Sequence, residues 1–451
     1  MSSLWQTVRR LSRRPEARHV GILTSGSVVA QVVLLATTPL LSRLYPPASF
    51  GILAALMTVS TIGGSIGGLC YEVAIIIPRS RRAAQALYRL SLVFSVLSAF
   101  LVMGLTWLVE ITFPKALDAA LTSTFYIVCF FTTIFTTQFN ILSYAHSRAL
   151  QYGAVAVSKF NQSFMPAVGQ IAFAWLGEAG LLIGRAAGML GSVLWLVRGL
   201  PEGYRLRDLR DMRAKPLVAV ARIYRDFLIQ VPRQLLVRSA SMLPSALLLG
   251  AYGPVAAGLY FFAARLVERP GMFLGDALSR VPMKQFADRR MRGDTLTRAA
   301  LLYTLAVGTP VILAVALLAA VAHPLFPFVF GKEWGPAADY AVVLAGWAAI
   351  RLVSLPMATL TTVLRIQRMS FYLDAIFAGR VFVIPLLAAN GAPALMAIAA
   401  FCALSVLYHL STFVLGLVSA LRYDRALRQT RELRESNEKA GLAYGQYSDA
   451  I

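Results

Sequence analysis

Charged and amide side chains interrupt several long apolar stretches of this chain, and arginine is the commonest charged residue among them. An arginine in the middle of a membrane span costs about 2.5–3.5 kcal/mol on insertion scales, so such residues face water, a carboxylate or a bound anion. Guanidinium groups bind phosphate through paired donors. The sequence therefore predicts an anion-selective hydrated cavity, with substrate-binding residues Gln31, Arg233, Gln234, Arg238, Arg265, Arg269, Arg351 and Arg380.

The spacing of these residues places most of them on helix faces, because residues three, four, seven, eight and eleven apart lie on one side of a helix. Two consecutive stretches carry such faces: Gln230, Arg233, Gln234, Arg238 and Ser241, then Arg265, Glu268, Arg269 and Asp276. Arg238 and Arg265 are expected to line the cavity. For Arg269, an ion pair with Glu268 is the alternative, and snorkelling is the alternative for arginines near span ends.

Two carboxylates and a proline are candidates for gating or coupling. Glu268 is predicted to hold Arg269 when no phosphate is bound, and to take up a proton when substrate releases it. Pro270-Gly271 interrupts the same stretch, and proline removes a backbone bond and kinks a helix. Asp374 lies six residues from Arg380, so the two are not expected to satisfy each other within one helix. The structural alternative is that Pro270 only shapes the bundle.

The elements that position these residues are long apolar segments, in a chain that is 58% hydrophobic and 14% charged. About 20 apolar residues span a bilayer, and no segment alternates as a membrane strand does. The sequence predicts an all-α polytopic membrane protein with about twelve transmembrane helices. They are expected near 20–42, 50–77, 87–109, 122–144, 155–176, 180–200, 226–250, 255–278, 298–321, 340–364, 370–389 and 394–420.

The basic residues are distributed unevenly between the two sides of these spans. Most of the 43 lysines and arginines lie in alternate gaps, whereas the opposite gaps hold only Arg43, Lys115 and Lys332. Positive loops stay in the cytoplasm, so both termini are predicted to be cytoplasmic. The formal net charge of +22 is then a topology signal, and nucleic-acid binding is not expected, because no soluble domain exists to carry the charge.

A short motif occurs twice and suggests an internal repeat. Tyr45 to Gly51 and Tyr252 to Gly258 both read Y-x-P-x-x-x-G, each between the first and second span of a six-span set. The predicted organisation is therefore two six-helix halves around a central cavity, with substrate at the repeat interface. Their bounds are 1–200 and 226–421, joined by a basic cytoplasmic linker at 201–225 and followed by a basic tail at 422–451.

No arrangement typical of an enzyme or a metal site is present. The three cysteines and four histidines are scattered, and nothing resembles a nucleophile elbow or a phosphate loop. The sequence predicts no catalytic residues, no bound metal and no cofactor, and hence a protein that is not an enzyme. The apolar stretch after Arg14 is too long for a signal-peptide core, so it is predicted to be an uncleaved first span.

Two stretches resemble the bacterial Wzx-type polysaccharide flippases of the multidrug/oligosaccharidyl-lipid/polysaccharide exporter superfamily. The first, from Pro39 to Pro78, contains Pro39-Leu-Leu-Ser-Arg43-Leu-Tyr45, Phe50-Gly51 and Tyr71-Glu72-Val-Ala-Ile-Ile-Ile-Pro78. The second contains Gly253-Pro254, Ala257-Gly258-Leu-Tyr260, Arg265-Leu266 and Pro270. The family typically has Arg-Tyr-Glu where this chain has Cys70-Tyr71-Glu72, so residue 70 does not carry over and Glu72 joins the gating candidates.

The resemblance implies a flippase that moves an oligosaccharide on undecaprenyl diphosphate to the periplasmic leaflet by alternating access. It also implies residence in the bacterial inner membrane, contact with membrane lipids, and possible partnership with a polysaccharide polymerase and a chain-length regulator. A drug or cation antiporter of the same superfamily is the nearest alternative, but its cavity should be lined by carboxylates. A membrane polysaccharide polymerase or ligase is the enzymatic alternative, and it usually has a long periplasmic loop that this chain lacks.

Overall fold

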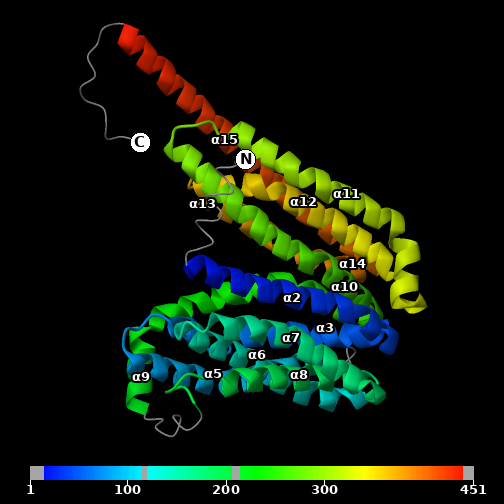
Figure 1. Cartoon of the computed structure of the whole chain (residues 1–451). Helices are drawn as coiled ribbons and strands as arrows, with labels where there is room; N and C mark the ends of the chain where they lie inside the picture. Colours follow the sequence, from blue (N-terminus) through cyan, green and yellow to red (C-terminus); the bar gives the residue numbers. More distant parts are fainter. Residues whose placement is uncertain (1–14, 113–118, 206–213, 440–451) are drawn as a thin grey trace. The chain divides into compact units, whose positions relative to one another are not determined.

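The computed structural model describes residues 15–112, 119–205 and 214–439, which form helices and no strands. The helices are α2 (Pro15–Leu44), α3 (Pro47–Ile66), α4 (Tyr71–Ala74), α5 (Arg81–Thr112), α6 (Ala119–Arg148), α7 (Tyr152–Ala172), α8 (Glu178–Arg198), α9 (Ala214–Ile223), α10 (Gln230–Met291), α11 (Thr297–Phe330), α12 (Ala337–Val363), α13 (Gln367–Ala378), α14 (Val383–Ala389) and α15 (Ala394–Lys439). Figure 1 labels most of them.

The predicted all-α polytopic architecture is confirmed. Nine helices within the described residues are long and apolar enough to cross a membrane, and Val29–Leu44 of α2 is a shorter apolar helix. The segments expected at 226–250 and 255–278 both lie in α10, and the segment at 370–389 is divided among α13, a 3₁₀ turn at Gly379–Phe382 and α14.

The chain divides into two compact units. Unit 1 contains Met1–Leu266, His323–Ala341 and Ile384–Ala397, and unit 2 contains Val267–Ala322, Val342–Val383 and Ile398–Ile451. This division follows spatial contacts and not the repeat, so the sequence halves at 1–200 and 226–421 stay a prediction.

Helices pack side by side in unit 1, where α7 packs against α2 and α8, and α6 packs against α3, α5 and α8 (Figure 1). Close approach to α3 depends on glycine. A Cβ on Gly63 would contact Val102 of α5, and one on Gly64 would contact Thr136 of α6. The small residues of α3 therefore serve packing within the bundle, as such residues commonly do in membranes.

Helix α3 ends earlier than the apolar pattern predicts. It stops at Ile66, and the short helix α4 follows two residues with left-handed backbone, Leu69 (φ 51°) and Cys70 (φ 60°). Arg148 then donates from Nη1 to the carbonyls of Ile75 and Ile76, at 2.9 and 3.2 Å. A side chain from α6 thus satisfies carbonyls that a continuous helix would have used itself.

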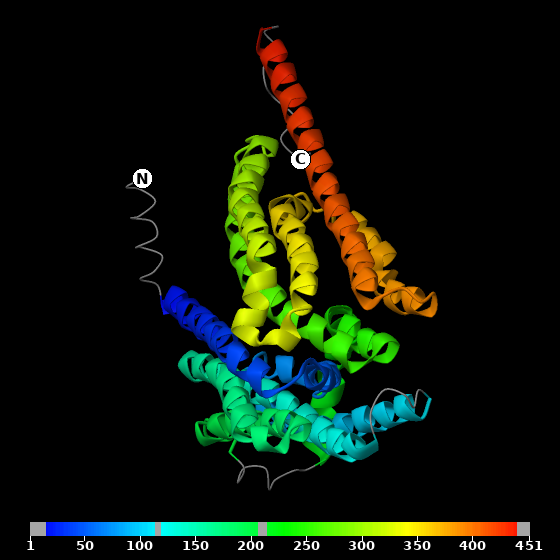
Figure 2. The ribbon, with the colours of Figure 1, turned by 90° about the vertical axis from the view of Figure 1, so that its right-hand side faces the viewer.

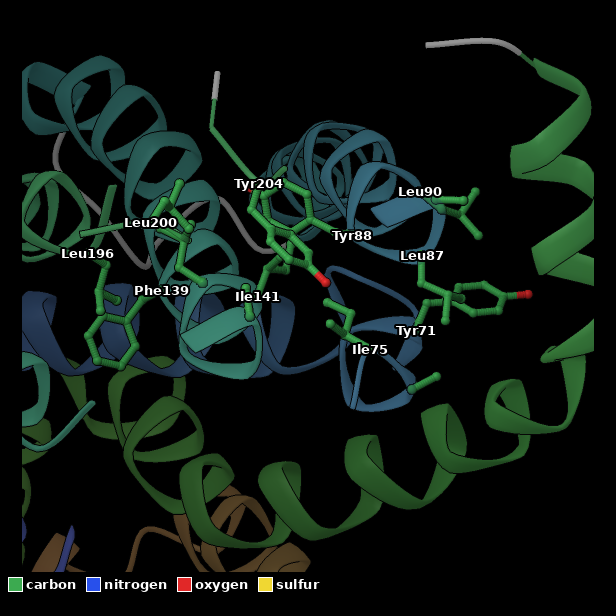
Figure 3. Packing of buried hydrophobic residues seen from close by; sticks show 14 of the residues in the cluster. Tyr71, Ile75, Leu87, Tyr88, Leu90, Phe139, Ile141, Leu196, Leu200 and Tyr204 are labelled. Carbon is green, nitrogen blue, oxygen red and sulfur yellow. The ribbon is translucent and has the colours of Figure 1, made fainter. Parts of the chain in front are cut away.

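A cluster of buried side chains fills the end of unit 1 where α5 begins and where α6 and α8 end. Figure 3 shows its members, among them Tyr71, Leu87, Tyr88, Leu196 and Tyr204. The cluster includes residues of the predicted linker, since Tyr204 and Val220 are both buried in it. The segment 201–225 is therefore folded against the bundle wherever the structure describes it.

Helix α10 is broken at a different residue from the one predicted. The helix continues through Pro270 and Gly271, so the expected interruption there is wrong at the level of the backbone. The non-helical backbone inside α10 is at Gly253 (φ 82°, ψ −179°), directly before Pro254. Glycine reaches this positive φ without the clash that a side chain would cause. The break separates two predicted spans at the position that corresponds to Pro46 in the first motif copy.

In unit 2 the last span runs on into a long helix, α15, whose basic stretch continues beyond the ends of α11 and α12 (Figure 2). Asp424 of α15 is buried, and its two carboxylate oxygens accept the backbone N–H groups of Leu296 and Thr297 at 2.8 and 3.0 Å. This carboxylate caps the first turn of α11, where unpaired donors and the helix dipole favour negative charge.

Candidate functional site

The two copies of the repeated motif touch each other in unit 1. A Cβ on Gly51 would overlap the carbonyl oxygen of Pro254, and a Cβ on Gly258 would overlap the carbonyl oxygen of Pro47. The proline of each copy therefore meets the glycine of the other, as a two-fold relation between the copies requires. Pro47 is also the first residue of α3, where proline costs no helical hydrogen bond.

Aromatic side chains complete this contact. Phe50, Phe262 and Trp334 are almost fully buried, with ring centroids 5.0 Å apart for Phe50 and Trp334 and 4.0 Å apart for Phe262 and Trp334. Trp334 also donates from its indole nitrogen to the carbonyl of Ser42 at 2.8 Å. Seven residues form what we call the closed end of unit 1, because backbone and aromatic rings pack directly against one another there: Pro47, Phe50, Gly51, Pro254, Gly258, Phe262 and Trp334.

The opposite end of unit 1 is basic. Helix α8 links the two ends, since Glu178 at its start accepts a hydrogen bond from Ser49 at 3.0 Å, and the carbonyl of Leu196 near its end lies 2.9 Å from His146. Arg81, Arg148 and residues 201–205 form what we call the basic end. The predicted cytoplasmic gaps at 78–89, 145–159 and 198–225 therefore meet at one end of this unit, and Arg43 lies at the other.

Two of the predicted site residues, Glu72 and Arg238, share an electrostatic neighbour that the sequence analysis missed. Tyr144 of α6 interacts electrostatically with the carboxyl of Glu72 and the guanidinium of Arg238. Glu72 is 4% exposed and lies against Gly68, and its Oε2 has no hydrogen-bond partner among the described residues. A buried ionisable group in a membrane protein marks an ion or proton pathway. Glu72 is such a group, whereas Tyr144 is half-buried and Arg238 is exposed, so Glu72 with these two neighbours is the strongest site candidate in unit 1.

The other predicted residues of unit 1 are Gln31, Arg233, Gln234 and Arg265. Gln31 is half-buried, and its amide nitrogen finds no acceptor in the part of the chain that the structure describes. Arg233 is exposed, whereas Gln234 and Arg265 are half-buried on α10.

Unit 2 brings Asp374 and Arg380 together, again around a tyrosine. Tyr408 of α15 donates from its hydroxyl to Asp374 Oδ1 at 2.6 Å, and the guanidinium of Arg380 lies 5.3 Å from the centroid of the same ring. Arg380 also donates from Nε to the hydroxyl of Ser405 at 3.0 Å and from Nη1 to the carbonyl of Phe377 at 2.8 Å. The two charges thus do not pair along one helix, as expected, but share Tyr408.

The break beside Arg380 has a local cause. Pro385 lacks an N–H and its ring opposes the carbonyl four residues earlier, which disfavours a regular helix there. The backbone forms a 3₁₀ turn at Gly379–Phe382 instead. The predicted combination of a broken helix and a charge inside a span is therefore found in this segment and not at Pro270.

Arg351 and Glu268 have separate surroundings in unit 2. The guanidinium of Arg351 lies 5.6 Å from the ring centroid of Trp347, which also packs near His409. Glu268 interacts electrostatically with the thiol of Cys402. The side chains of Arg269 and Pro270 lie outside those that the structure describes, so the predicted Glu268–Arg269 pair and the gating role of Pro270 stay predictions.

Tyr144, Tyr408, Trp347 and Asp424 are the residues that sequence reasoning missed. Tyr144, Tyr408 and Asp424 act through partners on other helices, which are distant in the chain, so no local spacing predicts them. Trp347 differs, because it lies four residues before Arg351 on α12. The described residues contain no group of three or more His, Cys, Asp or Glu side chains that could hold a metal ion. Phe330 and Trp334 are buried, whereas Phe328 is 80% exposed.

The fold is that of the transporters of the MOP superfamily. The chain resembles an inward-facing multidrug resistance MATE family transporter with a TM-score of 0.62 and 15% identity, over 89% of this chain and 96% of that one. It resembles the lipid II flippase MurJ with a TM-score of 0.64 and 11% identity, over 91% and 93% of the two chains. A MOP superfamily transporter from Pyrococcus furiosus gives a TM-score of 0.51 at 14% identity, over 93% and 98%.

The sequence itself identifies the family. The model of the family described as polysaccharide biosynthesis protein matches residues 40–339, which include both copies of the motif, and the chain belongs to this family. No curated protein matches the chain. The resemblance found in the two motif stretches is confirmed by the family match, and the predicted fold class is confirmed by the structural likeness.

Proposed function

We propose that this chain is a flippase that moves an oligosaccharide linked to undecaprenyl diphosphate from the cytoplasmic to the periplasmic leaflet by alternating access. The observation that carries the proposal is Arg238, a cation inside a predicted span of a polysaccharide biosynthesis family member, which acts electrostatically on Tyr144 as Glu72 does. A diphosphate headgroup is the anion that such a guanidinium would receive, while the polyprenyl tail stays in lipid.

The coupling step would use the same trio. With no substrate bound, the negative charge of Glu72 and the positive charge of Arg238 both act on Tyr144. A diphosphate carries more negative charge than one carboxylate, so it would compete for the guanidinium. Glu72 would then take up a proton, and transport would follow the proton gradient. The predicted Glu268–Arg269 pair offers the same exchange in unit 2.

Alternating access also needs an end that opens and shuts. The closed end is built from both copies of the motif, so separation of the two copies would open it. Rocking of repeats about a central site is the general scheme for transporters of this kind. The function requires residence in the inner membrane with both termini in the cytoplasm, and no catalytic residue.

The rival functions differ in the charge that they require. A drug or cation antiporter needs carboxylates at its binding site, whereas arginines outnumber carboxylates in the predicted spans of this chain. The Pyrococcus furiosus transporter is described as having a binding pocket of reverse polarity that suggests a different function. Pocket polarity is therefore a reasonable criterion between functions on this fold, and here it supports an anionic substrate over a cationic drug.

The test is export of lipid-linked glycan by cells whose only copy of the gene carries Arg238→Ala or Arg265→Ala. Both variants should insert normally and lose export, and Arg→Lys at either position should restore it only in part, because lysine lacks the paired donors of guanidinium. Arg222→Ala, at an exposed arginine of α9, is the matched control and should export normally. Normal export by both alanine variants would refute the proposal. Inhibition of export by cationic drugs in the variants, with no other defect, would refute it as well.

A further inference from the structure

A cavity of about 300 Å³ opens at the basic end of unit 1, and its lining contains no residue of α10. It is lined by Arg81, Arg148, Ala149, Pro201, Glu202 and Tyr204. These residues come from the start of α5, the end of α6 and the segment after α8, which the sequence places on the cytoplasmic side. Nothing in the proposed transport step uses this cavity.

The wall formed by the segment after α8 is held in place by its backbone. The N–H of Tyr204 donates to the carbonyl of Pro201 at 3.1 Å, and Gly203 between them has φ 88°, as the third residue of a type II turn requires. A side chain on Gly203 would overlap Gln85, so the turn lies directly on α5. The turn is thus a fixed part of the structure.

Tyr204 is the floor of the cavity. It is 4% exposed and packs edge-on against Tyr88 with ring centroids 5.2 Å apart, as Figure 3 shows. Its buried hydroxyl finds no acceptor among the described residues. Burial raises the pKa of Tyr204, and the charges of Arg148 and Arg81, together with a hydrogen bond from Arg148 to the hydroxyl, act on it in the opposite direction. Both guanidinium groups therefore lie within electrostatic reach of the hydroxyl.

The two arginines are anchored and still have donors to offer. Arg148 uses Nη1 for the carbonyls of Ile75 and Ile76, and Arg81 uses Nη2 for the carbonyl of Glu202. A guanidinium has five N–H donors, so each anchored group presents further donors at the cavity. Arg81 is exposed, as are the neighbouring arginines at 79 and 82, which add positive charge but do not line the cavity. Glu202 is the only acidic side chain in the lining.

We propose that this cavity is a phosphate-binding site, in which the guanidinium groups of Arg81 and Arg148 and the hydroxyl of Tyr204 donate hydrogen bonds to the anion. Two fixed guanidinium groups and a hydroxyl without an acceptor match the oxygens of a phosphate or diphosphate group. The site lies at the predicted cytoplasmic surface of the membrane, so the phosphate belongs to a lipid headgroup or to a soluble molecule. Binding here is independent of the proposed transport cycle.

The test uses the full-length protein in nanodiscs and two probes. Inorganic pyrophosphate is titrated calorimetrically into nanodiscs of neutral lipid, and retention of phosphatidic acid is measured by native mass spectrometry from nanodiscs that contain it. Arg81→Gln should weaken binding by about tenfold or more, since a hydrogen bond to a charged group contributes roughly 1.5–3 kcal/mol. Arg82→Gln, with the same loss of charge at an exposed neighbour, should change it less than about twofold. Glu202→Gln should strengthen binding.

Arg148→Gln should weaken binding too, but it also removes the cap of α4, so Arg81→Gln is the decisive variant. Binding of pyrophosphate that depends on Arg81 identifies a site for soluble phosphate, and binding of phosphatidic acid alone with the same dependence identifies a lipid headgroup site. Equal losses for Arg81→Gln and Arg82→Gln would reduce the cavity to a general basic surface and overturn the proposal. Absence of binding by either probe would overturn it as well.

Discussion

The two ends of unit 1 are built from the same helices but are held together by different interactions. At the closed end, glycine lets backbone meet backbone, and aromatic rings pack around that contact. At the basic end, arginines satisfy carbonyls of broken helices and leave a cavity. The packed closed end can open only if the two motif copies separate, whereas the basic end can bind a ligand in its cavity without a movement of the helices. The difference suggests that one end is a gate and the other a docking point.

The largest effect is expected at the closed end from Trp334→Ala. Trp334 is 1% exposed and loses both its ring contacts and its hydrogen bond to Ser42. Removal of a buried aromatic side chain costs about 3–5 kcal/mol. The free energy of unfolding is measured by urea titration in detergent micelles, with Phe328→Ala, at a residue 80% exposed, as the control. Equal losses for the two variants would mean that the closed end is not a packed contact.

The next effect is expected from Gly51→Ala. The new methyl group overlaps the carbonyl of Pro254 and must push the two motif copies apart. Overpacking of this kind costs about 1–3 kcal/mol, and a cysteine placed near the contact should become accessible to labelling from outside the cell. Gly346→Ala is the control, because its Cβ would meet nothing within 4 Å.

The reciprocal contact also predicts how the Gly51 and Gly258 variants combine. Gly258→Ala should act on the same contact, so the double variant should cost less than the sum of the two single variants. Additive losses would indicate two independent sites and would contradict the two-fold relation between the motif copies.

A smaller effect is expected at the basic end from Gly203→Ala. The backbone at φ 88° is unfavourable for alanine by about 1–2 kcal/mol, and the loss should also loosen the wall of the cavity. Gly391→Ala has a similar positive φ of 73° but no neighbour within 4 Å, so it measures the backbone cost alone. Pyrophosphate binding should fall only in Gly203→Ala. A fall in both variants would indicate a general loss of structure.

The smallest effect on stability is expected from Tyr204→Phe. The variant keeps the ring on Tyr88 and removes a buried hydroxyl that has no acceptor among the described residues. Loss of an unsatisfied polar group is nearly neutral or stabilising, within about 0.5 kcal/mol. Phosphate binding should still weaken, which separates the two roles of the residue. A loss of stability above 1 kcal/mol, on the order of a satisfied hydrogen bond, would show that the hydroxyl is structural.

Much of the fold follows from the sequence because its causes are local. A run of about 20 apolar residues must form a helix in lipid, and all twelve predicted spans are helical over most of their length. Breaks were less predictable. The sequence predicted an interruption at Pro270, but the helix continues there, because a single proline in a membrane helix can be accommodated without ending it. The backbone instead leaves the α-helical conformation at Gly253 and forms a 3₁₀ turn at Gly379–Phe382.

The candidate site divides in the same way. Their positions inside predicted spans identified Arg238, Arg380 and Asp374, because a charge in a span is costly, whereas the family resemblance identified Glu72. Their partners Tyr144 and Tyr408 lie on other helices, at sequence distances that no spacing rule covers. The repeated motif was visible in the chain, but its reciprocal contact was not, since a pattern of letters does not show which surface it faces.

The sequence by itself determined the helices, the charge asymmetry between alternate gaps, the two motif copies and the arginines that must be compensated. Those properties depend on each segment and its solvent, so neighbours along the chain are sufficient. Only the tertiary structure decided that Gly51 meets Pro254, that Tyr408 contacts both Asp374 and Arg380, and that Arg81 and Arg148 line one cavity. These depend on which helices pack together, and packing is settled by shape and by the satisfaction of buried polar groups over the whole unit.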